Sequence, residues 1–150
     1  MSRPKMLALA APAVAGSSRK VTLFTHTAES LPFDDQTFDT VVTTWSLCSI
    51  PDPVAALREA HRVLKPEGAL RFVEHGLSPN PGVAKWQTRL TPLWSRCAGG
   101  CHLNRKTDDL VRMAGFTLTE ISTGYASSFR PMSHSNCVLL LNMSEGAASH

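Results

Sequence analysis

The sequence has no long hydrophobic run and no dense cluster of one charge. Its most apolar N-terminal stretch, residues 6–15, is broken by Pro12 and is too short to span a bilayer or to resemble an export signal. No Lys/Arg run exceeds two residues, as at Arg105-Lys106, and the net charge is only +3. We therefore expect a cytoplasmic chain without a transmembrane segment, and we expect no nucleic-acid partner.

The cysteines form no evident framework. Four are present, at uneven spacings, and without an export signal they are expected to be reduced and to behave as small buried hydrophobes. An alternative is a zinc site formed by Cys97, Cys101, His102, His134 and Cys137. Gly99-Gly100 interrupts that group and Cys137 falls inside an apolar strand pattern, so the structural interpretation is favoured and no metal is expected.

What the sequence does contain is an alternation of strand and helix signals within one domain-sized chain of 150 residues, 43% of them hydrophobic. Asp52-Pro53 is typical of a helix start, and Pro66 and Gly68 end that helix. The expected helices cover residues 6–16, Pro53–Leu64, a segment from Trp86 to Trp94 that Pro92 interrupts, and Lys106–Ala114. The expected strands are Val21–Thr25, Thr40–Thr44, Leu70–Glu74, Phe116–Ser122 and Cys137–Asn142. This order predicts an α/β fold.

Several motifs resemble one family. Glu29-Ser30-Leu31-Pro32-Phe33, Phe38-Asp39, the block "REAHRVLKPEG" and "FVEH" resemble the class I S-adenosylmethionine-dependent methyltransferases, in particular the type 11 and ubiquinone-biosynthesis subgroup. "HLNRKTDDLVRMAGF" is similar to a later helix-strand unit of that subgroup. The resemblance implies a Rossmann-like, mainly parallel sheet with an antiparallel C-terminal strand, and S-adenosyl-L-methionine as cofactor.

The resemblance also implies elements that the sequence does not show. The family has a glycine-rich turn and a ribose-binding acid in its first half, but the nine glycines here form no G-x-G pattern. We therefore expect an N-terminally truncated sheet, with residues 1–143 forming a partial methyltransferase domain and residues 144–150 a flexible tail. The uncovered sheet predicts a homodimer that covers the gap.

The same resemblance supplies candidate cofactor-binding residues. Thr27 and Ala28 match the loop that contacts the adenine ring, although Thr27 replaces the usual Asp. The strand end at Thr43, Thr44 and Trp45, with Leu47 after it, lies where open parallel sheets bind ligands. Two alternatives stay open: Thr27 is a plain loop residue, or Trp45 serves only to pack the core.

His75 is the candidate catalytic base. It follows a predicted strand at its carboxyl end, and an imidazole is the side chain most often used as a general base, so it could take a proton from an acceptor. The alternative is a structural histidine. Cys48 is interpreted as a buried inert thiol rather than a base. Trp86 and Trp94 fit either an apolar lid over the acceptor or a core helix.

Two functions follow from these expectations. The first is methyl transfer from S-adenosylmethionine to a small-molecule or lipid-like acceptor, in which the enzyme contributes chiefly alignment. The second is a non-catalytic, truncated methyltransferase-like module that mediates interactions. The missing glycine turn favours the second for the isolated chain.

Overall fold

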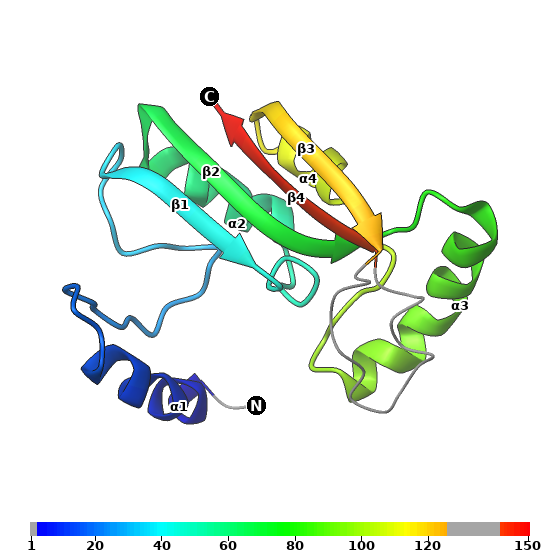
Figure 1. Ribbon diagram of the computed structural model, residues 1–150, viewed down its shortest axis with the longest axis horizontal. Helices are drawn as coiled ribbons and strands as arrows, with labels where there is room; N and C mark the ends of the chain where they lie inside the picture. Colours follow the sequence, from blue (N-terminus) through cyan, green and yellow to red (C-terminus); the bar gives the residue numbers. More distant parts are fainter. Residues whose placement is uncertain (1–2, 126–141) are drawn as a thin grey trace.

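The computed structural model describes residues 3–125 and 142–150, and in these ranges the chain forms four helices and one four-stranded sheet (Figure 1). The elements, in chain order, are α1 (Arg3–Ala15), β1 (Phe38–Thr44), α2 (Pro53–Val63), β2 (Leu64–Gly76), α3 (Pro81–Cys97), α4 (Thr107–Met113), β3 (Thr117–Tyr125) and β4 (Asn142–Ser149). None of the helices in these ranges is both long and apolar enough to cross a membrane.

The sheet has the order β1-β2-β4-β3. β1 and β2 are parallel, with Thr43 opposite Phe72, whereas β4 runs antiparallel to both β2 and β3. The fold class expected from the sequence, a Rossmann-like sheet with one antiparallel C-terminal strand, is confirmed. The parallel β1 and β2 end at the same edge of the sheet, which is where open α/β sheets bind ligands.

Helix α2 begins where the sequence indicates. Asp52 is its N-cap, accepting a hydrogen bond of 2.9 Å from the Ala55 amide, and Pro53 occupies the first turn, where its missing N–H costs nothing. Leu57, Ala60 and Val63 face the sheet and are buried. Helices α2 and α4 lie together behind the sheet, so one sheet face carries the core (Figure 1). Leu64, Leu70, Phe72, Val111 and Phe116 belong to this core.

Two sequence predictions need correction. Val21–Thr25 does not form a strand; its backbone is irregular and its side chains are exposed, Phe24 by 53%. A β-branched run becomes a strand only where another strand can pair with it, and none is placed beside this one in the sheet. The predicted strand at residues 137–142 lies outside the described residues, except for Asn142, which begins β4.

The residues expected to form a tail from position 144 instead contribute residues 144–149 to β4. One small residue of this segment, Gly146, is required by the packing of β4 between its neighbours. A Cβ on Gly146 would lie 2.4 Å from the Glu120 carbonyl oxygen and 3.0 Å from the Phe72 ring. A glycine therefore lets β4 fit between its two neighbours.

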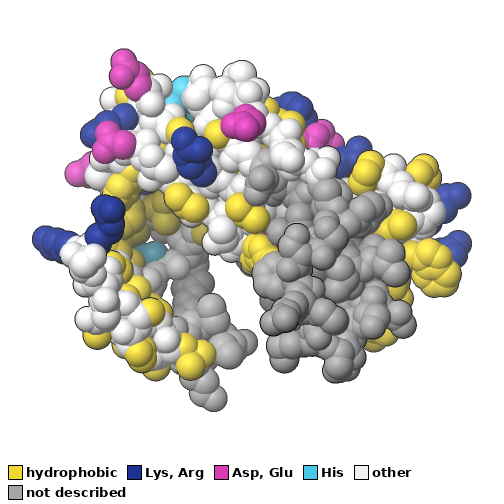
Figure 2. All heavy atoms as spheres, in the orientation of Figure 1, with side chains coloured by type: hydrophobic (Ala, Val, Ile, Leu, Met, Phe, Trp, Pro, Cys, Tyr) yellow, Lys and Arg dark blue, Asp and Glu magenta, His cyan; other side chains and the backbone are white. Residues whose placement is uncertain are grey.

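Helix α3 runs through Pro92 without interruption and exposes large apolar side chains. Trp86 is 59% exposed and Leu93 64%, and the Arg89 guanidinium lies 6.0 Å from the Trp86 ring centroid. Figure 2 shows yellow hydrophobic and blue basic side chains side by side at the right of the molecule, where α3 lies. Trp86 is therefore not a core residue, whereas Trp94 is half-buried.

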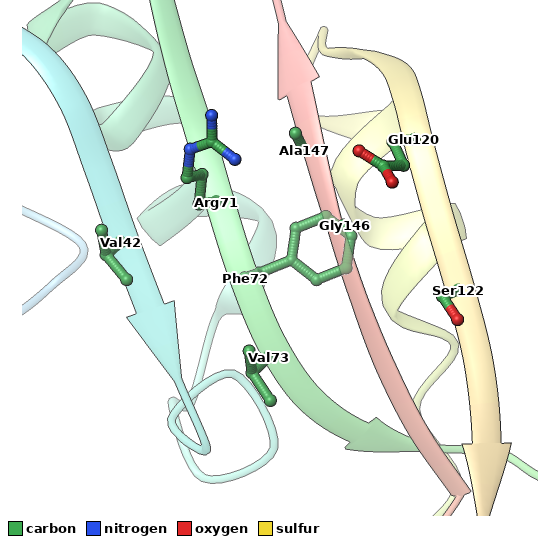
Figure 3. Close-up of a pocket in the computed structure, with 8 residues that line it drawn as sticks. All are labelled: Val42, Arg71, Phe72, Val73, Glu120, Ser122, Gly146 and Ala147. Carbon is green, nitrogen blue, oxygen red and sulfur yellow. The ribbon is translucent and has the colours of Figure 1, made fainter.

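The face of the sheet opposite α2 and α4 carries a shallow hollow of about 260 Å³. Figure 3 shows its lining along the middle of the strands: Val42, Arg71, Phe72, Val73, Glu120, Ser122, Gly146 and Ala147. Val42 is 66% exposed and belongs to β1, an edge strand of the sheet. An exposed edge with apolar side chains can pair with a strand of a second chain. The expected homodimer is consistent with this edge and stays a prediction.

Candidate functional site

The turn after β1 is organised by a buried carboxylate. Glu74, at the end of β2, is fully buried, and its Oε1 accepts hydrogen bonds from Thr43 Oγ1 (2.9 Å), the Ser46 amide (3.0 Å) and Ser46 Oγ (3.3 Å). These bonds join the carboxyl ends of the two parallel strands. Its Oε2 has no hydrogen-bond partner among the described residues. Glu74 thus fixes the path of the chain from Thr43 into the turn that carries Leu47 and Cys48.

A cavity of about 230 Å³ lies beside this turn, between β1, α2 and the loop before β1. Ala28, Thr43 and Leu47 line it, together with Leu31, Val41, Val42, Ser46, Ile50, Ala56, Leu57, Ala60 and Leu70. The lining is aliphatic, and its two hydroxyl groups, on Thr43 and Ser46, are already bonded to Glu74. Such a surface offers van der Waals contacts to an apolar group or ring face, and none of its lining side chains carries a charge.

An ion pair on α2 holds the loop before β1 in place. Arg62 donates to the carbonyl oxygens of Phe33 (2.8 Å) and Leu31 (3.3 Å) and pairs with Glu59 (2.8 Å), whose carboxylate accepts from the Leu31 amide (2.9 Å). The Arg62 hydrogen bond, reinforced by the Leu31 amide, lowers the pKa of Glu59 to about 2. Because Leu31 is held in this way, the preceding Ala28 reaches the cavity.

The structure brings together three of the six candidate cofactor residues. Ala28, Thr43 and Leu47 line the same cavity, whereas Thr27 pairs with Ser30 in an isolated bridge outside the lining. Thr44 and Trp45 also lie outside it; Trp45 is 49% exposed and has a φ of 51°. A positive φ at a bulky residue is uncommon and marks a sharp change of direction at the end of β1. The six residues remain a prediction as a cofactor-binding set.

His75 lies in a cluster that the sequence did not reveal. Its imidazole is 7% exposed, and Nε2 lies 3.2 Å from the Cys101 Sγ. The Cys48 thiol, 4% exposed, completes a group in which one side-chain donor atom from each residue lies within 4.8 Å of the others. The Nδ1 of His75 has no hydrogen-bond partner among the described residues. Cys101 is half-buried.

Glycines allow Cys101 to return to the sheet. Gly99 and Gly100 follow α3 with φ values of 62° and 89°, a left-handed backbone that glycine adopts without strain. The His102 amide then donates to the Cys48 carbonyl at 2.8 Å. Gly76 also requires its small size, because a Cβ there would lie 2.7 Å from the Arg105 carbonyl oxygen.

Arg105 closes the turn around Cys48. Its Nη1 donates to the carbonyl oxygens of Leu47 and Ile50, the latter at 2.7 Å. Burial lowers the pKa of Arg105, and the neighbouring Cys48, Cys101 and Asp52 oppose that shift.

The structure describes only part of the alternative zinc set. Cys97 is exposed, and His134 and Cys137 lie outside the described residues. Among the described members of that set, Cys101 joins the cluster with His75 and Cys48. The interpretation of Cys48 as an inert thiol missed this contact, which is made through the reversal at Gly99-Gly100. Those two glycines were the available signal.

The sheet and the helices packed on it form a Rossmann-like α/β fold. Residues 2–72 match a family described as "Methyltransferase domain". Over this part of the chain, just under half of it, the sequence is similar to that family.

Curated relatives agree with this similarity. The chain is 41% identical over 88 residues to the thiol S-methyltransferase TMT1B of Rattus norvegicus, covering 58% of this chain and 36% of the relative. It is 43% identical over 61 residues to the ubiquinone/menaquinone biosynthesis C-methyltransferase UbiE of a Ruegeria species, covering 41% of this chain and 24% of the relative. The chain thus spans between about a quarter and just over a third of these two relatives.

A solved structure shows the same fold over a greater share of this chain. An S-adenosylmethionine-dependent methyltransferase from Methanosarcina mazei superposes with a TM-score of 0.71 at 19% identity, covering 97% of this chain and 77% of the other. At this identity the likeness establishes the fold alone.

Proposed function

We propose that this chain supplies the acceptor-side half of an S-adenosylmethionine-dependent methyltransferase whose acceptor is a small thiol. One observation carries the proposal: the buried His75 imidazole lies beside two sulfur atoms at the carboxyl ends of β1 and β2. That edge is where this class of fold carries out its reactions. The similarity to a protein named as a thiol S-methyltransferase supports a thiol acceptor.

The proposed reaction needs few protein groups. His75 would take the proton of the acceptor thiol. S-adenosylmethionine, when bound, would supply the methyl group that the thiol sulfur accepts. The protein contributes alignment of the two sulfurs and removal of the proton. Ala28, Thr43 and Leu47 would hold the adenosine part of the cofactor in the cavity beside β1.

The isolated chain is expected to bind the cofactor weakly. The sequence has no G-x-G turn, and the cavity contributes no charged side chain. Each charged hydrogen bond that is absent costs ~1.5–3 kcal/mol, and each ~1.4 kcal/mol is tenfold in affinity. Two such losses move a micromolar site toward the millimolar range.

Titration calorimetry with S-adenosylhomocysteine tests this expectation. It should be run on the chain alone and on a version extended at the N-terminus with a glycine-rich turn and ribose-binding acid from a methyltransferase of this family. We expect binding of the chain alone in the millimolar range and of the extended version in the micromolar range. Micromolar binding by the chain alone would contradict the assignment of the missing contacts.

His75→Gln in the extended version tests the base. Turnover on a small thiol should fall by roughly 100-fold or more, the usual scale for losing a general base, while affinity for S-adenosylhomocysteine stays nearly unchanged. Cys97→Ser, at an exposed cysteine outside the cluster, is the matched control and should keep full turnover. Unchanged turnover in His75→Gln would show that alignment alone suffices.

A non-catalytic interaction module is the second candidate, and the open sheet face favours it. Val42 is 66% exposed on edge strand β1, beside the hollow of Figure 3. If this edge pairs with a second copy, sedimentation should show a dimer that Val42→Lys weakens, because a lysine on an edge strand opposes pairing. A monomer at all concentrations would exclude this form of the module.

A further inference from the structure

We propose that Cys48, His75 and Cys101 form a binding site for a soft divalent metal ion of the zinc class. This inference does not depend on the proposed methyl transfer. It goes against the expectation from the sequence, where no metal was predicted because Gly99-Gly100 interrupts the Cys/His group and Cys137 falls inside an apolar strand pattern.

The donor set matches the chemistry of zinc. Two thiolates and one imidazole are the ligands that this ion prefers, with Zn–S near 2.3 Å and Zn–N near 2.0–2.1 Å. In a tetrahedral site these lengths place the donor atoms ~3.5–3.8 Å apart. In the structure, His75 Nε2 and Cys101 Sγ are 3.2 Å apart, and all three donor atoms lie within 4.8 Å of one another. Shifts of about 1 Å or less would therefore complete the geometry.

The imidazole is held in place by burial, with His75 only 7% exposed. Its Nδ1 has no hydrogen-bond partner among the described residues. Its Nε2 faces the Cys101 Sγ, and Nε2 is therefore the nitrogen assigned to the ion.

The local charge balance also suits an ion. Two thiolates carry two negative charges, which a divalent ion would neutralise. The cluster is held from three directions: Cys48 by the turn after β1, His75 by β2, and Cys101 by the segment after Gly100. A preorganised site of this kind loses little entropy on binding an ion.

Metal binding and proton removal exclude each other at His75. A ring nitrogen bonded to the ion has no free lone pair, so a loaded site could not use that nitrogen as a base. The metal content of the protein therefore decides which of the two roles His75 can have.

The test uses the full chain with reduced thiols and two probes, Zn²⁺ and Co²⁺. Competition of Zn²⁺ against a chromophoric chelator should show one ion per chain. The affinity for Zn²⁺ should fall at least ~10-fold in each of three variants: Cys48→Ser, Cys101→Ser and His75→Gln. A ~10-fold loss is the smallest typical effect of changing a residue that only supports a metal ligand, and loss of a ligand itself should cost at least as much. Cys97→Ser, at the exposed cysteine, should bind as the parent does.

Two further measurements separate loss of ligands from loss of fold. Bound Co²⁺ should give thiolate-to-metal charge-transfer absorption that each of the two cysteine variants reduces. Zn²⁺ should slow alkylation of Cys48 and Cys101, mapped by mass spectrometry, but leave Cys97 unchanged. Circular dichroism should show that the serine variants keep the parent spectrum.

Three results would overturn the proposal. The first is no binding of stoichiometric Zn²⁺ by the parent chain. The second is equal binding by the parent and by both cysteine variants. The third is loss of binding in Cys137→Ser, because the ligands would then be a different set from the three residues assigned here.

Discussion

The buried Glu74 carboxylate provides the sharpest test of how the site is built. Its Oε1 accepts three hydrogen bonds. One of them comes from the backbone amide of Ser46, and another side chain could accept this bond only if the turn moved. Glu74→Ala leaves this buried N–H without an acceptor, which costs ~1–3 kcal/mol. The loss of one buried methylene group, Cγ, adds ~0.8 kcal/mol. The expected total is ~2–4 kcal/mol.

Glu74→Gln should behave differently. An amide oxygen can occupy the position of Oε1 and accept the same hydrogen bonds, while the amide nitrogen takes the position of Oε2, which has no partner in the structure. The variant also removes the cost of burying a charge. We therefore expect a loss of no more than ~1 kcal/mol. Glu120→Gln, at an exposed position on β3, is the matched control and should change stability by less than ~0.5 kcal/mol.

Urea unfolding followed by circular dichroism and tryptophan fluorescence measures these differences in free energy, and thermal unfolding measures Tm. For a chain of this length ~1 kcal/mol corresponds to ~2–4 °C in Tm, so Glu74→Ala should lower Tm by ~4–16 °C and Glu74→Gln by less than ~4 °C. Equal losses in the two variants would refute the reasoning, because the negative charge itself would then be what the site needs.

Three other changes have expected outcomes. Glu59 has its pKa lowered to about 2 by Arg62, so its contribution to stability is present above about pH 4.5 and is lost as pH falls toward 2; acid unfolding of Glu59→Gln should lack this component. Burial lowers the pKa of His61, so stability should fall as pH drops below about 6.5, and His61→Gln should flatten that part of the urea-unfolding profile. Gly146→Ala should cost ~1–3 kcal/mol in urea unfolding, because the new Cβ meets a backbone oxygen at 2.4 Å, whereas Gly82→Ala, with its nearest contact at 3.3 Å, should be close to neutral.

Local signals were sufficient for the helices and for the parallel pair of strands. Asp52 and Pro53 predicted the start of α2 because capping depends only on residues a few positions apart. Thr40–Thr44 and Leu70–Glu74 were predicted as strands from apolar runs, and both lie within strands of the sheet. Strand Val21–Thr25 was wrong because strand formation depends on a neighbour that a local pattern does not reveal.

The candidate site was predicted less well because its contacts are distant in sequence. His75 was identified from its place at a strand end, which is a local property. Its contact with Cys101 depends on how the chain runs through α3 and returns to the sheet. A hydrophobic pattern in the sequence does not predict that course. The role of Glu74 was missed for the same reason, since its partners, Thr43 and Ser46, belong to the previous strand and turn.

The position of β4 has a consequence for the order of assembly. Residues 142–149 follow every other element in sequence, yet they lie between β2 and β3 in the sheet. During synthesis β3 is therefore made before β4, the strand that lies between it and β2. Until β4 is made, β3 has no hydrogen-bonding partner in the sheet. The sheet closes only through contacts between residues far apart in the chain, which makes this step slow. A growing chain therefore exposes the facing edges of β2 and β3 until β4 is made, and unpaired strand edges of this kind are prone to aggregation.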